Sequence, residues 1–457
     1  MTSSRFTRPL AILAITECLI LCIAIIVSWD LLLNGTGRVS LLEMVLRAVL
    51  FCALFAAMMF ALGLYSGQAL TGLGDLLLRI ALAFFFAYAF YALLVYLVGE
   101  LRLPARVLTL ALVLAAPAVI AARLIFLRLT DLAQLKSRVL VLGTGKQARR
   151  IQQLERNDRW GRFSIVGFIA LEDGKPKVDA GRILVMPEDL ATFSQEHRVN
   201  EIVLALEERR GQTPLAPLIG ARLNGVEITD YQYFCEMAEG RVDLDALRPS
   251  WFFDPHGFRS GRLDRILKRV FDIALASGLL LFTLPLLLIT AIAIRVESPG
   301  PVFFRQERVG RGGRSFILIK FRSMRCDAES AQAPQWAQEK DPRVTRVGAV
   351  IRKTRIDEIP QVFNVLLGDM SFVGPRPERP YFVDMLAEHI PFYRERHAVR
   401  PGITGWAQLN YPYGASIEDA KEKLRYDLFY VKHFRIVFDL SIALQTVRVI
   451  LWPEGAR

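Results

Sequence analysis

Four apolar stretches in the first part of the chain constrain its fold more than any other feature. They cover about residues 10–29, 44–64, 77–98 and 106–127. Each approaches the roughly 20 residues that a helix needs to cross the hydrocarbon core of a bilayer. The first stretch is too long for a removable signal peptide and lacks a small-residue cleavage site. We therefore predict four membrane-spanning helices within residues 1–130.

The charges beside these helices predict their orientation. An even number of spans returns the chain to its starting side, and basic residues flank both ends. They are Arg5 and Arg8 before the first helix and Arg128, Lys136 and Arg138 after the last. Both ends are therefore predicted on the cytoplasmic side, although Arg38, Arg102 and Arg106 would then lie outside.

The composition is typical of a membrane protein with an anionic partner. Of the 457 residues 53% are hydrophobic, the mean hydropathy is +0.32 and the net charge is +12. Such a basic excess usually faces anionic lipid, a phosphorylated substrate or nucleic acid. Nucleic acid is disfavoured, because the basic residues are divided between membrane flanks and Gly/Pro loops, without a recognition helix or RNA-binding motif. The cysteines and histidines lack the spacing of a disulfide framework or a metal cluster.

A strand–turn–helix pattern follows the four apolar stretches, in "RVLVLGTGKQARRIQQLE". The apolar run Val139–Leu142 meets Gly143-x-Gly145, as in the first turn of a dinucleotide-binding unit. The segments "FSIVGFIAL" and "EIVLALEE" then alternate with helix-like stretches, which predicts a Rossmann-like α/β domain at about 138–245. Gly143 and Gly145 could let the backbone approach a pyrophosphate, or could only permit tight strand–helix packing. Both interpretations remain open.

A linker and a long hydrophobic segment come next. Residues 246–262 mix aromatic, basic, Pro and Gly residues, as exposed or interfacial connections do. Residues 268–295 are long enough to span a bilayer, but Pro285 near their middle removes a backbone hydrogen bond and kinks a helix. Because both flanks are basic, we predict a re-entrant helix hairpin rather than a fifth span, with Thr283 or a neighbour capping the carbonyls freed at Pro285.

The last third contains an acidic pair among basic residues, in "TRIDEIPQVFNVLLGDMSFVGPRPE". Asp357 and Glu358 follow Arg352 and Arg355, and Arg376 lies in a rigid Pro-Arg-Pro. We expect these cations to hold the carboxylates ionised at neutral pH. An ionised Asp can attack phosphorus, or it can hold Mg²⁺, which shields phosphate charges. The pair could instead cap a helix N-terminus, and spacing alone does not decide between these roles.

Residues 262–457 resemble the bacterial sugar transferase family, the monotopic polyprenyl-phosphate phosphoglycosyl transferases. The matching motifs, in family order, are "KRVFDIALA", "GPVFFRQERVG", "IKFRSM", "DEIPQVFNVLLGDMSFVGPRP" and "RPGITGWAQLN". The preceding parts resemble the long members that initiate exopolysaccharide or O-antigen synthesis. The resemblance implies a four-helix transmembrane domain, a Rossmann-like domain and a catalytic domain at 263–457 with the re-entrant hairpin. It also implies a multi-pass protein of the bacterial inner membrane, with its catalytic domain on the cytoplasmic face; a homodimer would suit the long members.

The resemblance also implies a reaction and its residues. A sugar-1-phosphate moves from a UDP-sugar to undecaprenyl phosphate, UMP is released, and Mg²⁺ is the cofactor. By that resemblance Asp357 is the nucleophile of an aspartyl-phosphosugar intermediate and contacts the metal, while Glu358 completes the dyad and assists the attack of the lipid phosphate or the metal. The residues implied to hold phosphate or shape the nucleotide pocket are Arg376, Arg352, Lys320, Arg322, Arg400 and Gln408.

Departures from the family pattern and two rival functions complete the expectations. Leu284 stands where the family often has Ser before the breaking proline, and Ile359 stands where it often has Leu. A membrane-tethered NAD-dependent nucleotide-sugar epimerase or dehydratase would need a Tyr-x-x-x-Lys pair, but "DYQYFCEMAEG" lacks the lysine. A non-catalytic membrane scaffold of a polysaccharide assembly complex would use the acidic pair only as a structural cap.

Overall fold

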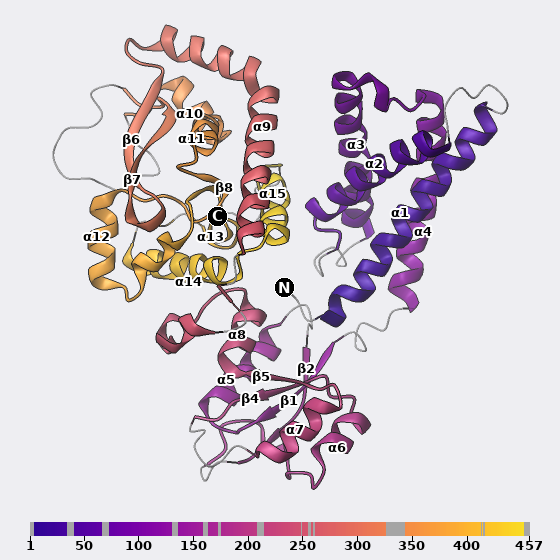
Figure 1. The fold of residues 1–457 in the computed structure, drawn as a ribbon, viewed down its shortest axis with the longest axis vertical. Helices are drawn as coiled ribbons and strands as arrows, with labels where there is room; N and C mark the ends of the chain where they lie inside the picture. The colour runs from indigo at the N-terminus through magenta and orange to yellow at the C-terminus, as the bar shows by residue number, and fades with distance from the viewer. Residues whose placement is uncertain are drawn as a thin grey trace. The chain divides into compact units, whose positions relative to one another are not determined.

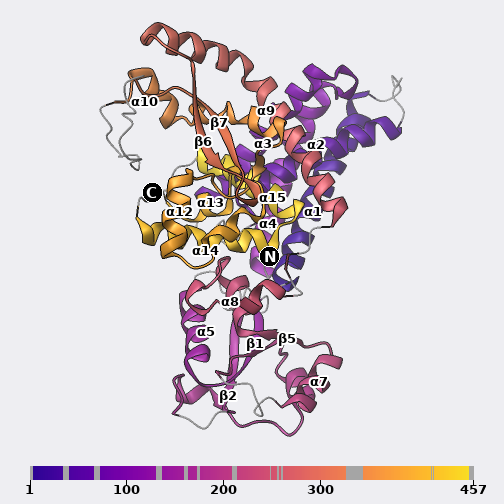
Figure 2. The ribbon, with the colours of Figure 1, turned by 60° about the vertical axis from the view of Figure 1, so that its left-hand side comes forward.

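The computed structural model divides the chain into two compact units, Met1–Glu239 and Gly240–Arg457. Figures 1 and 2 colour the first unit from indigo to magenta and the second from pink to yellow. The structure describes residues 4–33, 41–65, 73–129, 136–158, 163–171, 175–207, 214–247, 249–254, 257–258, 261–325, 343–412, 414 and 416–451. Of the residues discussed above, Arg38 lies outside these ranges, and the side chains of Arg5 and Arg8 are not described.

Four long helices cover the four apolar stretches. They are α1 (Ser4–Leu33), α2 (Leu41–Ala61), α3 (Leu73–Leu97) and α4 (Ala105–Leu129). Their shared core includes Phe51 and Phe55 of α2 and Ala111 of α4, while other apolar side chains such as Ile15 and Phe85 are exposed. Helices that are apolar inside and outside are typical of a lipid environment. Each is long and apolar enough to cross a membrane, as is α9 in the second unit.

A parallel sheet forms the rest of the first unit, with its strands in the order β3-β2-β1-β4-β5. The strands are β1 (Ser137–Leu142), β2 (Phe163–Ile169), β3 (Ile183–Leu184), β4 (Glu201–Leu204) and β5 (Glu227–Asp230). The helices between and after them are α5 (Lys146–Asn157), α6 (Leu190–Glu196), α7 (Leu215–Leu223) and α8 (Tyr231–Glu239). Successive residues of the central strand β1 belong to different cores, Val139 to one and Leu140 to the other. This is expected for a strand that is covered on both faces. The prediction of an α/β fold with a parallel sheet is confirmed.

The second unit begins before the predicted catalytic domain. It starts at Gly240, and part of the predicted linker 246–262 packs within it. Trp251 is only 4% exposed, and the ammonium group of Lys432 lies 4.8 Å from its ring centre. Lys432 belongs to α14 (Ile417–His433). This part of the linker is therefore buried against α14, rather than forming an exposed connection, because an aromatic ring and an ammonium group attract each other.

The hydrophobic segment forms one continuous helix, α9 (Arg262–Glu297), that contains Pro285. Figures 1 and 2 show α9 change direction before it leads to β6. Pro285 cannot donate to the carbonyl of Leu281, which accounts for a bend. The Thr283 hydroxyl donates to the carbonyl of Leu279, 2.7 Å away, rather than to that of Leu281. The predicted break is thus a bend within a helix, and Thr283 bonds the carbonyl two residues before the one that proline frees.

Both parts of α9 pack on the second unit. The first part buries Lys268, Asp272 and Ala276, which are four residues apart and so lie on one helix face. The second part buries Leu287 and Ile294 against Phe321 and Ile351. The outward side chains between these buried positions are apolar and exposed.

The remaining elements of the second unit surround α9. They are β6 (Phe303–Val309), β7 (Ser315–Phe321), α10 (Arg346–Lys353), α11 (Gln361–Leu367), β8 (Ser371–Val373), α12 (Pro380–His389), β9 (Gly402–Thr404), α13 (Trp406–Asn410) and α15 (Ile436–Leu451). β6 and β7 form an antiparallel hairpin, and β8 pairs with β9 in parallel. Val362 and Val365 of α11 pack between Ala276 of α9 and Leu318 of β7, so α11 has a fixed place beside the bent helix.

A buried ionic network fixes the first part of α9. The Lys268 ammonium group lies 3.2 Å from Asp272 and 2.9 Å from Asp439 of α15, and it donates to the Val373 carbonyl of β8 at 3.2 Å. The Ser371 hydroxyl donates to Asp272 at 3.0 Å. Removing one member would leave a buried charge without compensation, which is strongly destabilising. The network therefore holds β8, the strand that leads into the Pro-Arg-Pro segment.

Candidate active site

An unusual turn carries the acidic pair. After α10 the chain passes through Arg355, whose φ of 60° lies in the left-handed region, and enters the short 3₁₀ helix Ile356–Glu358. A residue other than glycine adopts this conformation only where its surroundings enforce it. Asp357 and Glu358 are each only 9% exposed. Neither carboxylate is the N-cap of α11, because that position is Pro360, which makes no side-chain cap hydrogen bond.

Two cations hold Glu358. Nζ of Lys320 in β7 and Nη2 of Arg376 both donate to Oε1 of Glu358, at 3.0 Å and 2.8 Å. A guanidinium nitrogen of Arg355 lies 3.9 Å from the same oxygen. Burial would raise the pKa of Glu358, but Arg376 and Lys320 outweigh it and hold that pKa well below its usual range. Glu358 is therefore ionised at neutral pH, as the sequence predicts.

Asp357 is in a different electrostatic position. Its Oδ1 is buried and has no hydrogen-bond partner among the described residues. Burial and the negative charge of Glu358 raise the pKa of Asp357, against the opposing charges of Lys320, Arg355 and Arg352. The pKa of Asp357 is thus shifted in the opposite direction from that of Glu358, because burial and the neighbouring carboxylate outweigh the cations, and its ionisation at neutral pH stays a prediction.

The free oxygen of Asp357 fits the implied Mg²⁺. This ion usually binds proteins through one or two carboxylates and completes its shell with water and substrate phosphates. A buried carboxylate oxygen without a protein donor can supply such a ligand. Within the described part of the chain, no group of three or more His, Cys, Asp or Glu side chains could hold a metal ion. The donor set thus fits a cation shared with a substrate phosphate, rather than one enclosed by protein ligands.

The structure brings together most of the residues that the sequence singled out. Lys320 and Arg376 contact Glu358 directly, and Arg352, in the last turn of α10, is close enough to affect the pKa of Asp357. About a third of the Arg376 side chain is exposed, so a ligand can reach this side chain from solvent. From the sequence, Arg355 is only one of the cations that precede the acidic pair. Its sequence position carries no signal of the left-handed conformation that brings it to Glu358.

Arg322 lies elsewhere. Its side chain is buried, and its guanidinium group donates to the Pro299 carbonyl at 2.9 Å and to the Ser298 carbonyl at 2.8 Å. These carbonyls belong to the end of α9 and the turn that follows. Both terminal nitrogens of the Arg322 guanidinium group are therefore already bonded within the protein.

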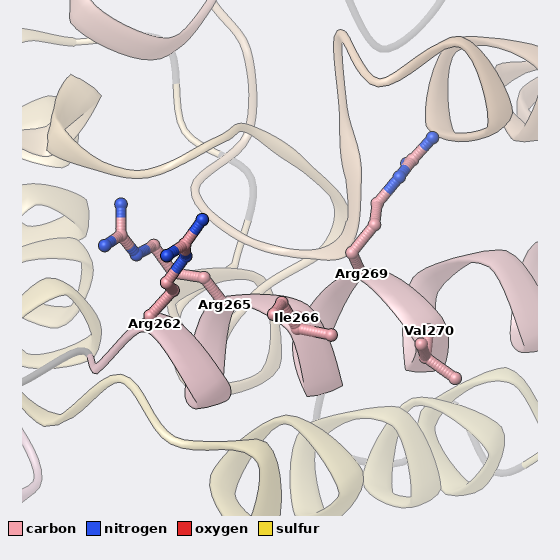
Figure 3. A pocket seen from close by; sticks show the side chains of 5 residues that line it. All are labelled: Arg262, Arg265, Ile266, Arg269 and Val270. Carbon is pink, nitrogen blue, oxygen red and sulfur yellow. The ribbon is translucent and has the colours of Figure 1, made fainter.

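Arg400 lies in a second group of cations. Figure 3 shows Arg262, Arg265 and Arg269 on the first turns of α9, where they line a cavity of about 330 Å³ together with Ile266 and Val270. Burial and then the charges of Arg269 and Arg311 lower the pKa of Arg400, so this cationic group is crowded. Arg400 has no hydrogen bond or ion pair with the acidic pair in the described part of the chain.

Gln408, the last predicted site residue, is half-buried on α13. Its amide nitrogen donates weakly to the Ile403 carbonyl at 3.3 Å, and its Oε1 has no hydrogen-bond partner among the described residues. Its predicted role at a nucleotide pocket stays a prediction, because no contact joins it to the acidic pair.

The glycine turn of the α/β domain is used for packing. Gly143 has a φ of 121°, and a Cβ there would lie 2.3 Å from the Ala205 carbonyl oxygen. Only glycine permits such an approach between neighbouring strands. The first backbone N–H of α5, at Lys146, donates to Glu207 at 2.6 Å. A carboxylate thus occupies the helix end where a pyrophosphate would bind, so nucleotide binding at Gly143 and Gly145 stays only a prediction.

Comparisons with known proteins find a separate family model in each of the two compact units. Residues 263–453 match the family model described as bacterial sugar transferase, and residues 60–213 match a model described as CoA-binding domain. The chain is 34% identical over 318 residues to UDP-glucose:undecaprenyl-phosphate glucose-1-phosphate transferase of Escherichia coli (strain K12), which covers 68% of this chain and 67% of that protein. These findings show that the chain belongs to the bacterial sugar transferase family.

Two further relatives match mainly one half of the chain. UDP-N-acetylgalactosamine-undecaprenyl-phosphate N-acetylgalactosaminephosphotransferase of Aeromonas hydrophila is 47% identical over 222 residues, or 49% of this chain; the chain spans about half of that protein, 52% of its length. Exopolysaccharide production protein PSS of Rhizobium leguminosarum bv. phaseoli is 44% identical over 193 residues, 40% of this chain and 95% of that protein. A match of this length is about the size of the second unit.

Proposed function

We propose that the chain is a phosphoglycosyl transferase that moves a sugar-1-phosphate from a UDP-sugar to undecaprenyl phosphate. This would be the first membrane step of exopolysaccharide or O-antigen synthesis. The names of the Escherichia coli and Aeromonas relatives support these substrate classes. The observation that carries the proposal is the free, buried Oδ1 of Asp357, beside a carboxylate that Lys320 and Arg376 hold ionised.

The first step forms a bond between Asp357 and phosphorus. A carboxylate oxygen of Asp357 attacks the phosphorus next to the sugar, and the bond from that phosphorus to the UMP oxygen breaks. UMP leaves with the electron pair. Oδ1 has no hydrogen-bond partner among the described residues, so its attack breaks no hydrogen bond there, and a carboxylate of raised pKa is the more basic nucleophile. Arg376 and Arg352 offset the charge of the phosphate groups.

The second step transfers the phosphosugar to the lipid carrier. An oxygen of undecaprenyl phosphate attacks the same phosphorus, and the bond to Asp357 breaks, which regenerates the carboxylate. Glu358 is a poor proton acceptor, because its pKa lies well below the usual range. Its role in the dyad is therefore to orient Lys320 and Arg376, which both bind its Oε1. Asp357 would hold Mg²⁺, which would supply charge neutralisation at the transferred group.

The bend of α9 supports a re-entrant arrangement in the inner membrane. Buried residues near both ends of α9, Lys268 and Ile294, pack within the same unit. On a straight helix these two residues would be about 39 Å apart, on opposite sides of a hydrocarbon core of about 30 Å. Basic residues stand at both ends, including Arg262 and Arg295, and such flanks favour the cytoplasmic side. The four helices α1–α4 then span the membrane, and the catalytic domain lies on its cytoplasmic face.

Release of UMP tests the function directly. Full-length protein in lipid nanodiscs is incubated with undecaprenyl phosphate and each of a panel of UDP-sugars. We expect UMP release with at least one UDP-sugar, together with a lipid-linked diphosphate product. If no UDP-sugar gives UMP under these conditions, the non-catalytic scaffold becomes the better interpretation.

The pH dependence of the first step should reflect the raised pKa of Asp357. The nucleophile must be ionised, so the rate should fall as the pH drops through a pKa higher than that of an ordinary aspartate. Replacing Glu358 by Gln removes the neighbouring negative charge and so lowers the pKa of Asp357. The pH at which the rate falls should therefore be lower in this variant, even though the rate itself is smaller at every pH. Measuring the rate of UMP release against pH for both proteins checks this. Glu388→Gln, at an exposed position, is the control. If the rate of Glu358→Gln falls at the same pH as that of the wild type, the pH dependence does not report Asp357.

A further inference from the structure

The C-terminal end of α9 is joined to the strand that holds Glu358. Arg322 follows β7, is 6% exposed, and donates to carbonyls of Ser298 and Pro299 at 2.8 and 2.9 Å. Ser298 and Pro299 directly follow α9, and Nη2 of Arg322 also lies 3.5 Å from the carbonyl of Ile294 in its last turn, where a cation is favourable. Lys320, two residues before Arg322, binds Glu358 at 3.0 Å. Three residues of chain thus connect the end of α9 with one carboxylate of the dyad.

The same end of α9 is joined to the helix that precedes Asp357. Glu297, the last residue of α9, accepts hydrogen bonds from the backbone N–H groups of Arg346 at 2.7 Å and Val347 at 3.0 Å. These are the first N–H groups of α10, and a carboxylate at a helix N-terminus stabilises it. α10 ends at Lys353, and only Thr354 separates it from the left-handed Arg355, which leads into the 3₁₀ helix that carries Asp357.

An apolar cluster lies between these two polar links. Ile294 of α9, Phe321 of β7 and Ile351 of α10 are buried against one another, and Leu287 extends the cluster along α9. Close-packed side chains transmit displacement rather than absorb it. The second part of α9, the end of β7 and α10 therefore move together, and the acidic pair moves with them.

We propose that Glu297 and Arg322 are positioning residues that hold the dyad at a fixed depth relative to the membrane-inserted part of α9. The inference rests on the proposed two-step transfer and adds these two residues to it. A soluble UDP-sugar can approach Asp357 wherever the dyad lies. The phosphate of a lipid carrier is confined to the bilayer surface, so the second step depends on the depth of Asp357, and a displacement of about 1 Å can cost about 100-fold in rate.

The test separates the two steps in full-length protein reconstituted in nanodiscs. Exchange of labelled UMP into UDP-sugar, without lipid carrier, reports the first step. Transfer from the preformed covalent intermediate to undecaprenyl phosphate, in a single turnover, reports the second. In Glu297→Ala we expect the second step to slow between about 10-fold and 100-fold, while exchange changes less than about twofold. Glu297 is exposed, so the variant should fold.

Matched variants distinguish positioning from a general loss of stability. Asp419→Asn removes a carboxylate that accepts the Ser416 N–H at the start of α14, in the same unit, and both steps should stay within about twofold of the wild type. Arg322→Lys keeps the charge but loses the forked donor geometry, so it should slow the second step less than Arg322→Gln does. Thermal unfolding of each variant records its stability.

Three results would overturn the inference. Both steps could slow equally in Glu297→Ala, neither could change, or Asp419→Asn could show the same selective loss. If the wild-type protein shows no UMP exchange that depends on Asp357, the proposed function itself is overturned, and the positioning role with it. The ratio of the second step to the first is therefore the deciding measurement.

Discussion

Replacing Asp357 by Asn is expected to lower sugar-phosphate transfer by about 10⁴-fold or more, since the amide cannot act as the nucleophile. The substitution is nearly isosteric, and Oδ1 has no hydrogen bond to lose within the described residues, so the fold should persist. The measurement is UMP release by full-length protein in nanodiscs with a UDP-sugar and undecaprenyl phosphate. Mass spectrometry of the protein incubated with UDP-sugar alone should show a phosphosugar adduct in the wild type and none in the variant.

The control for this prediction is Asp384→Asn. Asp384 is exposed on α12 and pairs with Arg394 at 2.8 Å, and among the described residues it has no hydrogen bond or ion pair with the dyad. Its variant should transfer at the wild-type rate, because exposed ion pairs contribute little to stability. Transfer that survives in Asp357→Asn, with the protein folded and in the membrane, would sink the nucleophile assignment and favour a structural role for the acidic pair.

Replacing Arg376 by Ala should lower kcat between about 100-fold and 1,000-fold, the loss typical of removing one preorganised donor to a developing charge. Arg376 binds Glu358 at 2.8 Å, yet about a third of its side chain is exposed, so it can reach a phosphate at the same time. Its loss also leaves Lys320 as the main partner of a buried carboxylate. Steady-state kinetics with UDP-sugar, giving kcat and KM separately, measure the effect.

Arg394→Ala is the matched control for Arg376→Ala. It also removes one guanidinium group from the second unit, but at an exposed position outside the site. Its kcat should not change. A raised KM with an unchanged kcat in Arg376→Ala would mean that Arg376 binds the substrate and its transition state equally well, which contradicts a role at the transferred phosphate.

Local patterns predicted the elements of the fold. Four runs of about 20 apolar residues can be little else than long helices, because a helix satisfies its own backbone hydrogen bonds wherever water is absent. The apolar run Val139–Leu142 predicted a buried parallel strand, and it is the central strand of the sheet. The motif around Asp357 and Glu358 indicated the family, which the comparisons confirm.

Long-range contacts decided what the local patterns could not. Lys320 and Arg322 are two residues apart and were given the same role, yet one binds Glu358 and the other closes the end of α9. Trp251 lies in a segment with the composition of a linker, but Lys432, far along the chain, holds its ring in a buried site. No periodicity in the sequence reports which distant groups such side chains will meet.

The sequence by itself determined the apolar helices, the parallel sheet and the identity of the acidic pair, since these depend on residue type and on neighbours close along the chain. Only the tertiary structure decided that burial and Glu358 raise the pKa of Asp357 while Arg376 and Lys320 lower that of Glu358. Two adjacent carboxylates differ in this way because an electrostatic environment is a sum over charges and solvent in space. Folding places those charges around the acidic pair from β7, from the end of α10 and from the segment after β8.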